Sequence, residues 1–277
     1  MTLPDAKPND ITSPTKQPLI IGHRGSSWLA PENTMAAFRQ ALADGADGIE
    51  FDVRLARDGV PVVIHDANLR RVAFREDLVS LLNSTDLATC DVGSWFNQRF
   101  PALAQTSFAT ERVPTLDQLF SFFSSSEGLL YLEMKCSQGE GPLLAREVAK
   151  SIQNYSFHDR VVVLSFDLPA LQAVKSIDPE IRTGALFQPR VFAPGSLILK
   201  GTMVRAAQRY GADEIALHKL LARPTIIRQA SAAGLNTVVW TVDNPAWLET
   251  ARHLGVHAII TNSPHAMLPR HRALAMS

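Results

Sequence analysis

Short apolar runs alternate along the chain with longer segments of helical periodicity. After a polar, proline-rich stretch at 1–18, the first run is Leu19–Gly22, and a helical pattern follows at 34–44. An apolar run bounded by turn residues predicts a buried strand, and apolar residues at every third or fourth position predict a helix packed on it. We expect a flexible arm over 1–18 and then a strand–turn–helix unit, with Asn33 as the helix N-cap and Gly45 at its C-terminal stop.

The next run, Gly48–Leu55, alternates between polar and apolar residues. Side chains along a strand point alternately to its two faces, so Glu50, Asp52 and Arg54 share one face of the predicted strand. The apolar residues between them face the opposite side and predict a buried surface there.

An Asp-Gly pair at 58–59 separates this strand from the apolar run at 60–66. Such a pair between two alternating runs predicts a β-hairpin, so the second run is expected to lie antiparallel to the first. A two-residue loop places Asp52 opposite His65, with their Cβ atoms about 5 Å apart. A β-bulge would shift this register by one residue.

The segment 67–114 has no clean period and carries Trp95, Phe96, Phe100 and Phe108. Insertions of this length are usually functional, often as a lid or a wall of a binding site. The alternative is a small satellite subdomain packed by its aromatic residues, and the two interpretations are compatible.

From residue 115 onward, strand and helix patterns alternate regularly. The predicted strands lie at 129–134, 161–166, 182–187, 214–217, 237–241 and 258–261, and the predicted helices at 115–120, 142–154, 169–177, 199–210, 224–233 and 245–254. With the strands at 19–22 and 48–55 this gives eight parallel strands, which predict a closed (β/α)8 TIM barrel over 19–277.

Composition excludes several classes of protein. Hydrophobic residues make up 46% and charged residues 19% of the chain, which suits a large folded core. Lys+Arg and Asp+Glu both number 27, so nothing predicts a nucleic-acid partner. No apolar run approaches the ~20 residues of a transmembrane helix. The N-terminal stretch lacks the features of a secretory signal, so we expect a cytoplasmic protein with Cys90 and Cys136 as free thiols.

Polar residues gather where the predicted strands end, the face at which barrels of this type carry their active sites. They are His23 and Arg24 on the first strand, Glu50 and Asp52 on the second, Glu133 and Lys135 on the third, and Ser165, His218 and Trp240 farther round. Each signal has a structural explanation when taken alone. A structural explanation must nevertheless account for six charged or titratable groups at one end of three consecutive barrel strands.

Three converging carboxylates, Glu50, Asp52 and Glu133, call for a cation, because like charges at short range otherwise raise each other's pKa. Oxygen-only ligands favour one divalent cation, Mg²⁺ or Ca²⁺, over zinc. Two histidines, His23 and His65, beside such a cation and near an arginine and a lysine, are typical of a site for a phosphate ester.

Several motifs in order resemble those of the glycerophosphodiester phosphodiesterases over about residues 19–264. They are His-Arg-Gly at 23–25, Pro-Glu-Asn-Thr at 31–34, Glu-x-Asp at 50–52, the Asp-Gly turn, His-Asp at 65–66, Val-Gly-Ser-Trp-Phe at 92–96, Val-Pro-Thr-Leu at 113–116, Glu-Met-Lys at 133–135, Val-Trp-Thr-Val at 239–242 and Ile-Ile-Thr-Asn-Ser-Pro at 259–264.

The resemblance implies a TIM barrel with an inserted segment and a role for each candidate residue. Glu50, Asp52 and Glu133 would hold the divalent metal, His23 and His65 would be the general acid–base pair, Arg24 and Lys135 would bind the phosphate, and Trp240 would line the glycerol side. The role of Trp240 rests on the resemblance alone. The roles of Glu214 and His218 stay open, either in the pocket or in the structure.

The implied reaction is hydrolysis of a small glycerophosphodiester, such as glycerophosphocholine or glycerophosphoethanolamine, to glycerol 3-phosphate and an alcohol. One alternative is a lysophospholipase D with the aromatic insertion as an acyl-chain wall; another is a non-catalytic barrel that binds metal and phosphate, which has no need for both histidines. The sequence leaves open the headgroup, the metal, the subunit number, the histidine that acts as base, and attack by water or by a glycerol hydroxyl.

Overall fold

A closed barrel of parallel strands dominates the computed structural model, which describes residues 17–137, 139–189 and 202–275. Its strands are β1 (Leu19–His23), β2 (Gly48–Leu55), β3 (Pro61–Val63), β4 (Leu129–Met134), β5 (Val161–Ser165), β6 (Arg182–Phe187), β7 (Glu214–His218), β8 (Asn236–Trp240) and β9 (Ala258–Thr261). The sheet order is β1-β9-β8-β7-β6-β5-β4-β2-β3, and a β1–β2 pairing closes the ring. Strand β3 pairs antiparallel with β2 and lies outside the ring. The predicted TIM barrel is confirmed. The arm expected at 1–18 lies almost wholly outside the described residues.

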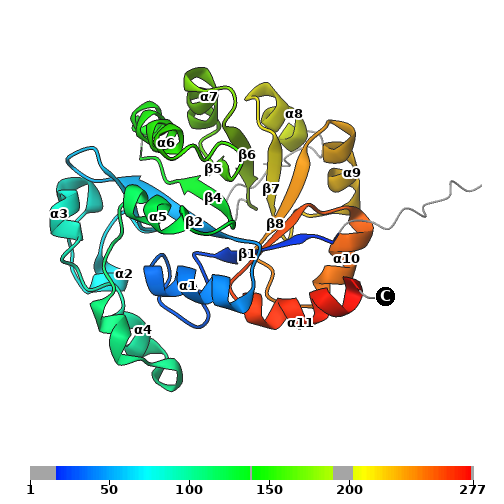
Figure 1. Cartoon of the computed structure of the whole chain (residues 1–277). Coiled ribbons are helices and arrows are strands. Elements are labelled where there is room, and N and C mark those ends of the chain that lie inside the picture. The colour runs from blue at the N-terminus through cyan, green and yellow to red at the C-terminus, as the bar shows by residue number, and fades with distance from the viewer. Residues whose placement is uncertain (1–16, 138, 190–201, 276–277) are drawn as a thin grey trace, which may run out of the picture.

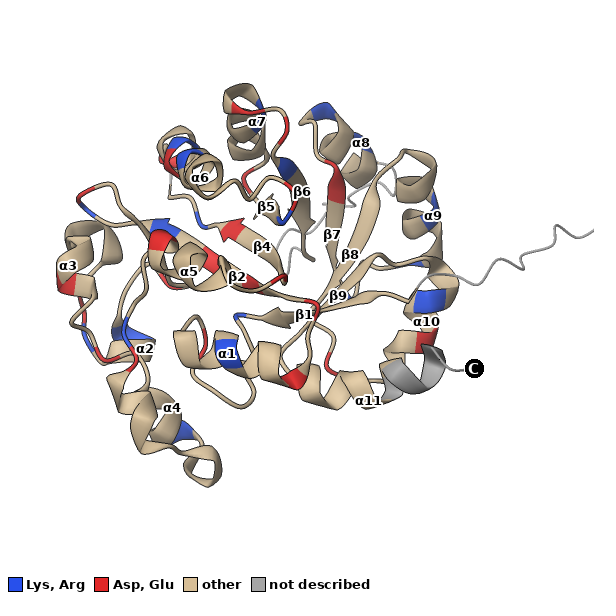
Figure 2. Ribbon diagram, viewed as in Figure 1, with Lys and Arg blue, Asp and Glu red and all other residues tan. Residues whose placement is uncertain are grey.

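Helices surround the barrel and follow its strands in turn (Figure 1). They are α1 (Met35–Asp44), α5 (Leu116–Phe123), α6 (Gly141–Tyr155), α7 (Leu168–Ile177), α8 (Thr202–Arg209), α9 (Pro224–Ala232), α10 (Trp247–Leu254) and α11 (Pro264–Ala275). The start of the helix expected at 199–210 falls outside the described residues. Acidic and basic segments are interspersed over these outer helices (Figure 2). None of the helices in the described residues is both long and apolar enough to cross a bilayer.

Two apolar layers hold the barrel together. Side chains such as Ile21, Tyr131 and Val162 fill its interior. The apolar face of β2 packs outward against the helices, with Phe51 and Val53 fully buried there. Glu50, Asp52 and Arg54 therefore point to the inner side of β2, as its alternating pattern predicts.

The hairpin register differs by one residue from the predicted one. Val53 pairs with Val63, and the backbone N–H of Ile64 donates to the Asp52 carbonyl oxygen at 2.9 Å, so Asp52 lies opposite Ile64 and not His65. The loop has three residues, because the backbone N–H of Ala56 donates to the Val60 carbonyl. Gly59 has φ +78°, the left-handed conformation that ends such three-residue loops.

The predicted N-cap of α1 is also wrong by one residue. Thr34 caps the helix, and its Oγ1 accepts a hydrogen bond from the backbone N–H of Ala37. Asn33 instead has φ 56° and turns its amide to Asp52: its Nδ2 donates to Asp52 Oδ2 at 2.8 Å, and its Oδ1 accepts from the Asp52 backbone N–H. The asparagine therefore serves the site and not the helix.

The segment between β3 and α5 forms short helices on one side of the barrel (Figure 1). These are α2 (Arg70–Ala73), α3 (Ser84–Leu87) and α4 (Ser94–Arg99), with 3₁₀ turns at Val79–Leu81, Pro101–Leu103 and Thr106–Thr110. Phe96 and Phe108 are buried with their ring centroids 5.5 Å apart, whereas Phe100 is partly exposed. The aromatic residues of the segment thus pack on one another and on Ala30 and Ala37.

Helix α1 packs closely on the turn after β1, and replacing Gly25 in that turn tests this packing. The φ of Gly25 is +83°, and a Cβ atom there would lie 2.5 Å from the Ala37 carbonyl carbon, whereas Gly59 has φ +78° with nothing within 4 Å. Both Gly→Ala variants place an alanine in the left-handed conformation, which lowers the free energy of unfolding by about 1 kcal/mol, and only Gly25→Ala adds a backbone clash. Urea unfolding should show that the free energy of unfolding of Gly25→Ala is lower than that of the parent by about 3 kcal/mol or more. Equal losses in the two variants would contradict this packing.

Candidate active site

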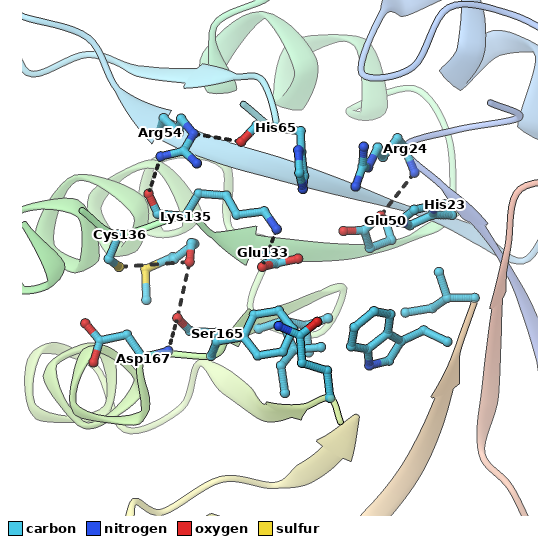
Figure 3. A pocket seen from close by; sticks show the side chains of 17 residues that line it. His23, Arg24, Glu50, Arg54, His65, Glu133, Lys135, Cys136, Ser165 and Asp167 are labelled. Carbon is cyan, nitrogen blue, oxygen red and sulfur yellow. Dashed lines mark hydrogen bonds and ion pairs between the residues drawn. The ribbon is translucent and has the colours of Figure 1, made fainter. Parts of the chain in front are cut away.

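A cavity of about 510 Å³ opens at the carboxyl ends of the barrel strands. The candidate residues that line it are His23, Arg24, Glu50, His65, Glu133, Lys135, Ser165 and Trp240. All of these except Trp240 are labelled in Figure 3. Asp52 lies beneath them, with 1% of its surface exposed, and contacts two of the cationic residues. The lining residues come from 23–65 and 133–260, so the described part of the insertion 67–114 supplies none of them.

The three predicted metal-binding carboxylates lie together at the base of this cavity. Glu50, Asp52 and Glu133 are buried, and one oxygen atom from each lies within 4.8 Å of those of the other two. Their closeness follows from the sheet, because Asp52 on β2 is the register partner of Glu133 on β4. Burial and the charge of Asp52 raise the pKa of Glu133 to about 7, and burial, Asp52 and Glu133 raise the pKa of Glu50 well above its usual value.

Two cationic side chains partly neutralise the trio. Arg24 Nε lies 3.1 Å from Asp52 Oδ2, and Lys135 Nζ lies 3.2 Å from Asp52 Oδ1 and 2.7 Å from Glu133 Oε1. Burial alone raises the pKa of Asp52, but Arg24 and Lys135 outweigh it and hold this pKa below its usual value.

The trio has the donor set of a cation site. Lys135 Nζ is the partner of both Asp52 Oδ1 and Glu133 Oε1, so one ammonium group faces two buried carboxylates. Buried carboxylate oxygens clustered from three acidic residues have the chemistry of a site for a hard divalent cation. The residues present therefore fit such an ion.

Hydrogen bonds through Asn262 to Asp243 fix the tautomer of His23. Asn262 Nδ2 donates to Asp243 Oδ2 at 2.9 Å, since a carboxylate can only accept, and this turns Asn262 Oδ1 toward His23. His23 Nδ1 lies 2.6 Å from that oxygen and must donate to it. Nε2 then carries the lone pair on the cavity side. Burial and neighbouring Arg24 lower the pKa of His23 to about 4, so its imidazole is neutral.

His65 makes the corresponding contact with a carboxylate. Its Nδ1 lies 2.6 Å from Asp66 Oδ1, which leaves Nε2 for the cavity. The pKa of His65 is lowered, because burial and the charges of Arg24 and Lys135 outweigh the charge of Asp52 and the hydrogen bond with Asp66. The one-residue error in the hairpin register therefore did not remove His65 from the site.

The turn after β1 brings Arg24 into the cavity with a strained backbone. Arg24 has φ 54°, and its backbone N–H donates to Glu50 Oε2 at 3.0 Å. Its NH1 donates to Glu32 Oε1 at 2.7 Å. A left-handed arginine is costly and is typical of functional sites.

Several residues that support the candidate groups carry no sequence signal of a site role. Glu32 and Asn33 belong to the Pro-Glu-Asn-Thr motif, which by itself predicts only a helix start, and Asp66 and Asn262 lie in motifs that carry only the family resemblance. Asp66 and Asn262 each follow the end of a strand within a few residues, but that position identifies no partner.

Arg54, on β2, joins the two segments that follow β3 and β4. Its Nε donates to the carbonyl oxygen of His65 at 2.8 Å, and its NH1 donates to that of Lys135 at 3.2 Å (Figure 3). This arginine therefore ties the backbone of His65 to the backbone of Lys135.

An aromatic wall stands opposite the charged groups. The ring centroid of Trp240 lies 5.7 Å from that of Phe166 and 5.2 Å from that of His218. Phe166 is 38% exposed, and Lys135 Nζ lies 5.8 Å from its centroid. His218 supports Trp240 from outside the cavity lining.

Two other polar candidates have structural contacts. Ser165 Oγ donates to the Met134 carbonyl oxygen and accepts from the Asp167 backbone N–H. Glu214 is buried at the opposite, amino end of its strand, where its Oε2 accepts a hydrogen bond from the Tyr131 hydroxyl group at 3.2 Å. Glu214 is therefore remote from the cavity.

A barrel with paired imidazoles and cationic side chains above a buried acidic trio defines the class of the protein: a hydrolase of phosphate diesters. The chain belongs to the glycerophosphoryl diester phosphodiesterase family, whose sequence profile matches residues 23–266. It is an enzyme of this class and hydrolyses glycerophosphodiesters.

Individual relatives agree with this assignment. A glycerophosphodiester phosphodiesterase of Caldanaerobacter subterraneus is 32% identical over 252 residues, covering 90% of this chain and 96% of the relative. One from Bacillus subtilis is 28% identical over 265 residues, covering 94% and 88%.

Solved structures show the same fold. A glycerophosphodiester phosphodiesterase of Agrobacterium tumefaciens has a TM-score of 0.74 at 29% identity, covering 91% of this chain and 99% of the other. An Oleispira antarctica phosphodiesterase, solved with the product sn-glycerol-3-phosphate, has a TM-score of 0.79 at 24% identity, covering 94% and 98%.

Proposed function

We propose that the enzyme uses one divalent cation, Mg²⁺ or Ca²⁺, and the pair His23 and His65 to cleave small glycerophosphodiesters such as glycerophosphocholine or glycerophosphoethanolamine. The products are glycerol 3-phosphate and the alcohol. One observation carries the proposal: both imidazoles line the same cavity, above the buried trio Glu50, Asp52 and Glu133.

The charged residues receive the phosphate. Glu50, Asp52 and Glu133 hold the cation, which when bound neutralises charge on the phosphoryl oxygens. Arg24 and Lys135 line the cavity beside the trio and bind the remaining phosphoryl oxygens. Trp240 offers an apolar surface to the glycerol carbon atoms.

The contacts of the two histidines favour different proton-transfer roles. His23 donates from Nδ1 to a neutral amide and lies beside Arg24, so its neutral form is favoured and Nε2 can accept a proton from the nucleophile. His65 contacts the Asp66 carboxylate, which stabilises the imidazolium. His23 is then the base, and His65 is the acid that protonates the leaving oxygen.

A substrate panel tests the proposed substrate class. Released glycerol 3-phosphate is measured for glycerophosphocholine and glycerophosphoethanolamine, and released choline is measured for glycerophosphocholine and the competing substrate lysophosphatidylcholine, each in Mg²⁺, in Ca²⁺ and without added metal. The two small diesters should be turned over in at least one metal, and lysophosphatidylcholine should be cleaved at least tenfold more slowly. The cavity lining supports this order, because the aromatic insertion contributes no described residue to it. Faster cleavage of lysophosphatidylcholine would favour the lysophospholipase alternative, and no release from either small diester would refute the proposed substrates.

A further inference from the structure

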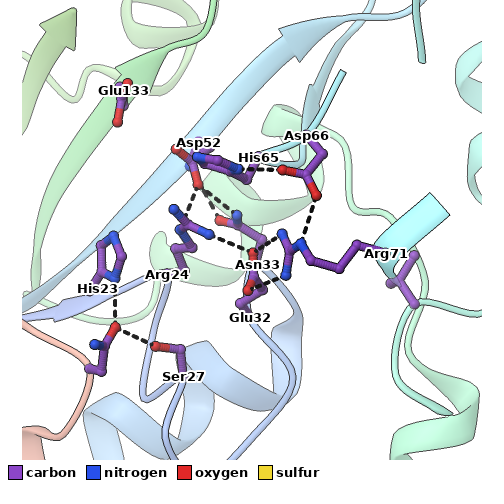
Figure 4. A network of polar contacts seen from close by, with 12 residues as sticks. His23, Arg24, Ser27, Glu32, Asn33, Asp52, His65, Asp66, Arg71 and Glu133 are labelled. Atoms are coloured by element: carbon purple, nitrogen blue, oxygen red, sulfur yellow. Dashed lines mark hydrogen bonds and ion pairs between the residues drawn. The ribbon is translucent and has the colours of Figure 1, made fainter. Parts of the chain in front are cut away.

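The inserted segment contacts residues that support the candidate site, through Arg71 on α2, which does not itself line the cavity (Figure 4). Arg71 Nε donates to Asp66 Oδ2 at 2.7 Å. Its NH1 and NH2 donate to Glu32 Oε2 and Oε1, each at 2.8 Å, which is a two-point contact. One guanidinium group therefore joins two carboxylates that lie 34 positions apart in the chain.

Each of these carboxylates also binds a residue that lines the cavity. Asp66 Oδ1 lies 2.6 Å from His65 Nδ1, and Glu32 Oε1 accepts from Arg24 NH1 at 2.7 Å. The result is a continuous row of contacts, His65–Asp66–Arg71–Glu32–Arg24, which we term the positioning row. Arg71 is its centre, and the two cavity residues are its ends.

The centre of the row is fixed by the insertion itself. The Arg71 guanidinium carbon lies 5.6 Å from the ring centroid of Trp95, and Trp95 Nε1 donates to the Val92 carbonyl oxygen. A planar guanidinium packed on an aromatic ring and bound at three nitrogen atoms has little freedom to rotate. Asp66, bound through both oxygens, is held in one plane, and this holds the ring of His65.

We propose that Arg71 is a positioning residue that orients His65 through Asp66 and Arg24 through Glu32, so that the insertion serves catalysis without contacting substrate. The proposal rests on the roles given above to His65 and Arg24. The positioning row has two arms: the Asp66 arm runs from Arg71 to His65, and the Glu32 arm runs from Arg71 to Arg24. The Asp66 arm acts on proton transfer and so on kcat, whereas the Glu32 arm acts on phosphate binding and so on KM.

Loss of Arg71 disturbs both arms for electrostatic reasons. Without it, Asp66 Oδ2 loses its ionic partner, and the carboxyl group can turn away from His65. Glu32 would then pair with Arg24 alone and compete for it with Asp52, whose Oδ2 lies 3.1 Å from Arg24 Nε. Arg24 would be drawn toward Glu32 and away from the phosphate position.

Arg71→Met removes the guanidinium group and keeps most of the aliphatic part of the side chain. Arg70→Met is its matched control. Arg70 lies on the same helix, pairs with Glu76 at the exposed surface, and contacts no member of the positioning row among the described residues. We expect Arg71→Met to lower kcat/KM about 10–100-fold, with a lower kcat and a higher KM, because small misplacements of catalytic groups have effects of this size. Arg70→Met should stay within about twofold of the parent enzyme, and thermal unfolding of both variants checks the fold. Equal kinetics for the two variants would overturn the proposal.

A double-mutant cycle with Asp66→Asn separates positioning from general damage to the structure. If Arg71 acts on kcat through Asp66, adding Arg71→Met to Asp66→Asn should lower kcat by less than about threefold and still raise KM through the Glu32 arm. A kcat loss in the double variant equal to the product of the two single losses would show that Arg71 acts elsewhere. His65→Ala is measured alongside: if it retains turnover, the proposed function fails, whereas an inactive His65→Ala with a fully active Arg71→Met refutes this inference alone.

Discussion

His23→Ala and His65→Ala should each lower the turnover of glycerophosphocholine by about 10²–10⁴-fold, the usual contribution of a general acid or base. Both side chains are partly exposed at the cavity, and each is held by a hydrogen bond at Nδ1, to Asn262 for His23 and to Asp66 for His65. Neither replacement removes a core contact, so the melting temperature should change little. Near-normal turnover in both variants would overturn the assignment of the acid–base pair.

A change of leaving group distinguishes the two histidines. Glycerol 3-phosphate esterified to 4-nitrophenol releases a stable phenolate, which needs no proton. His65→Ala should therefore lose far less activity on this ester than on glycerophosphocholine, because its proposed role is to protonate the leaving oxygen. His23→Ala should lose about the same factor on both substrates. The reverse pattern would exchange the roles of base and acid.

Removal of the divalent cation should abolish activity in the parent enzyme, and added Mg²⁺ or Ca²⁺ should restore it. A cation bound by Glu50, Asp52 and Glu133 also stabilises the folded state over the unfolded chain, so the melting temperature should rise with metal concentration after EDTA treatment. Glu133→Gln should lose both the activity and this rise.

Glu214→Gln is the matched control for that experiment. Glu214 is also a buried glutamate, but it lies at the other end of the barrel and accepts a hydrogen bond from Tyr131. Its variant should keep the metal response of the parent enzyme. Undiminished activity in a verified metal-free preparation, or a metal response retained in Glu133→Gln, would refute the proposed ion site.

The barrel could be predicted because its signals are local and repeat. Each strand is an apolar run, and each helix follows with its own period, so errors at single boundaries do not change the strand count. The inner face of β2 followed from simple alternation, which placed Glu50 and Asp52 correctly on the barrel side.

The two errors arise where a single backbone conformation decides the outcome. Asn33 is a favourable N-cap by type, but it adopts φ 56° and binds the buried Asp52, a partner 19 residues away. The hairpin loop is one residue longer than predicted because Gly59 takes the left-handed position of a three-residue turn. Neither choice is visible in a pattern of apolar and polar positions.

The supporting residues could not be predicted for a different reason. Asp66 adjoins His65 in the sequence, but the distances from Glu32 to Arg71 and from His23 to Asn262 are set by the folded chain. Sequence reasoning identifies groups that reach the cavity from strand ends. It does not identify the second carboxylate, amide or guanidinium that holds each of them.

The closure of the ring has a consequence for the newly made polypeptide. His23 ends β1, which pairs with both β2 and β9, and its tautomer is fixed by Asn262, which directly follows β9. The ribosome synthesises His23, the proposed base, early and its amide partner more than two hundred residues later. Hydrolysis should therefore begin only after translation has passed the final strand. A protease that removes that strand should abolish activity, although the remaining chain keeps every proposed catalytic residue.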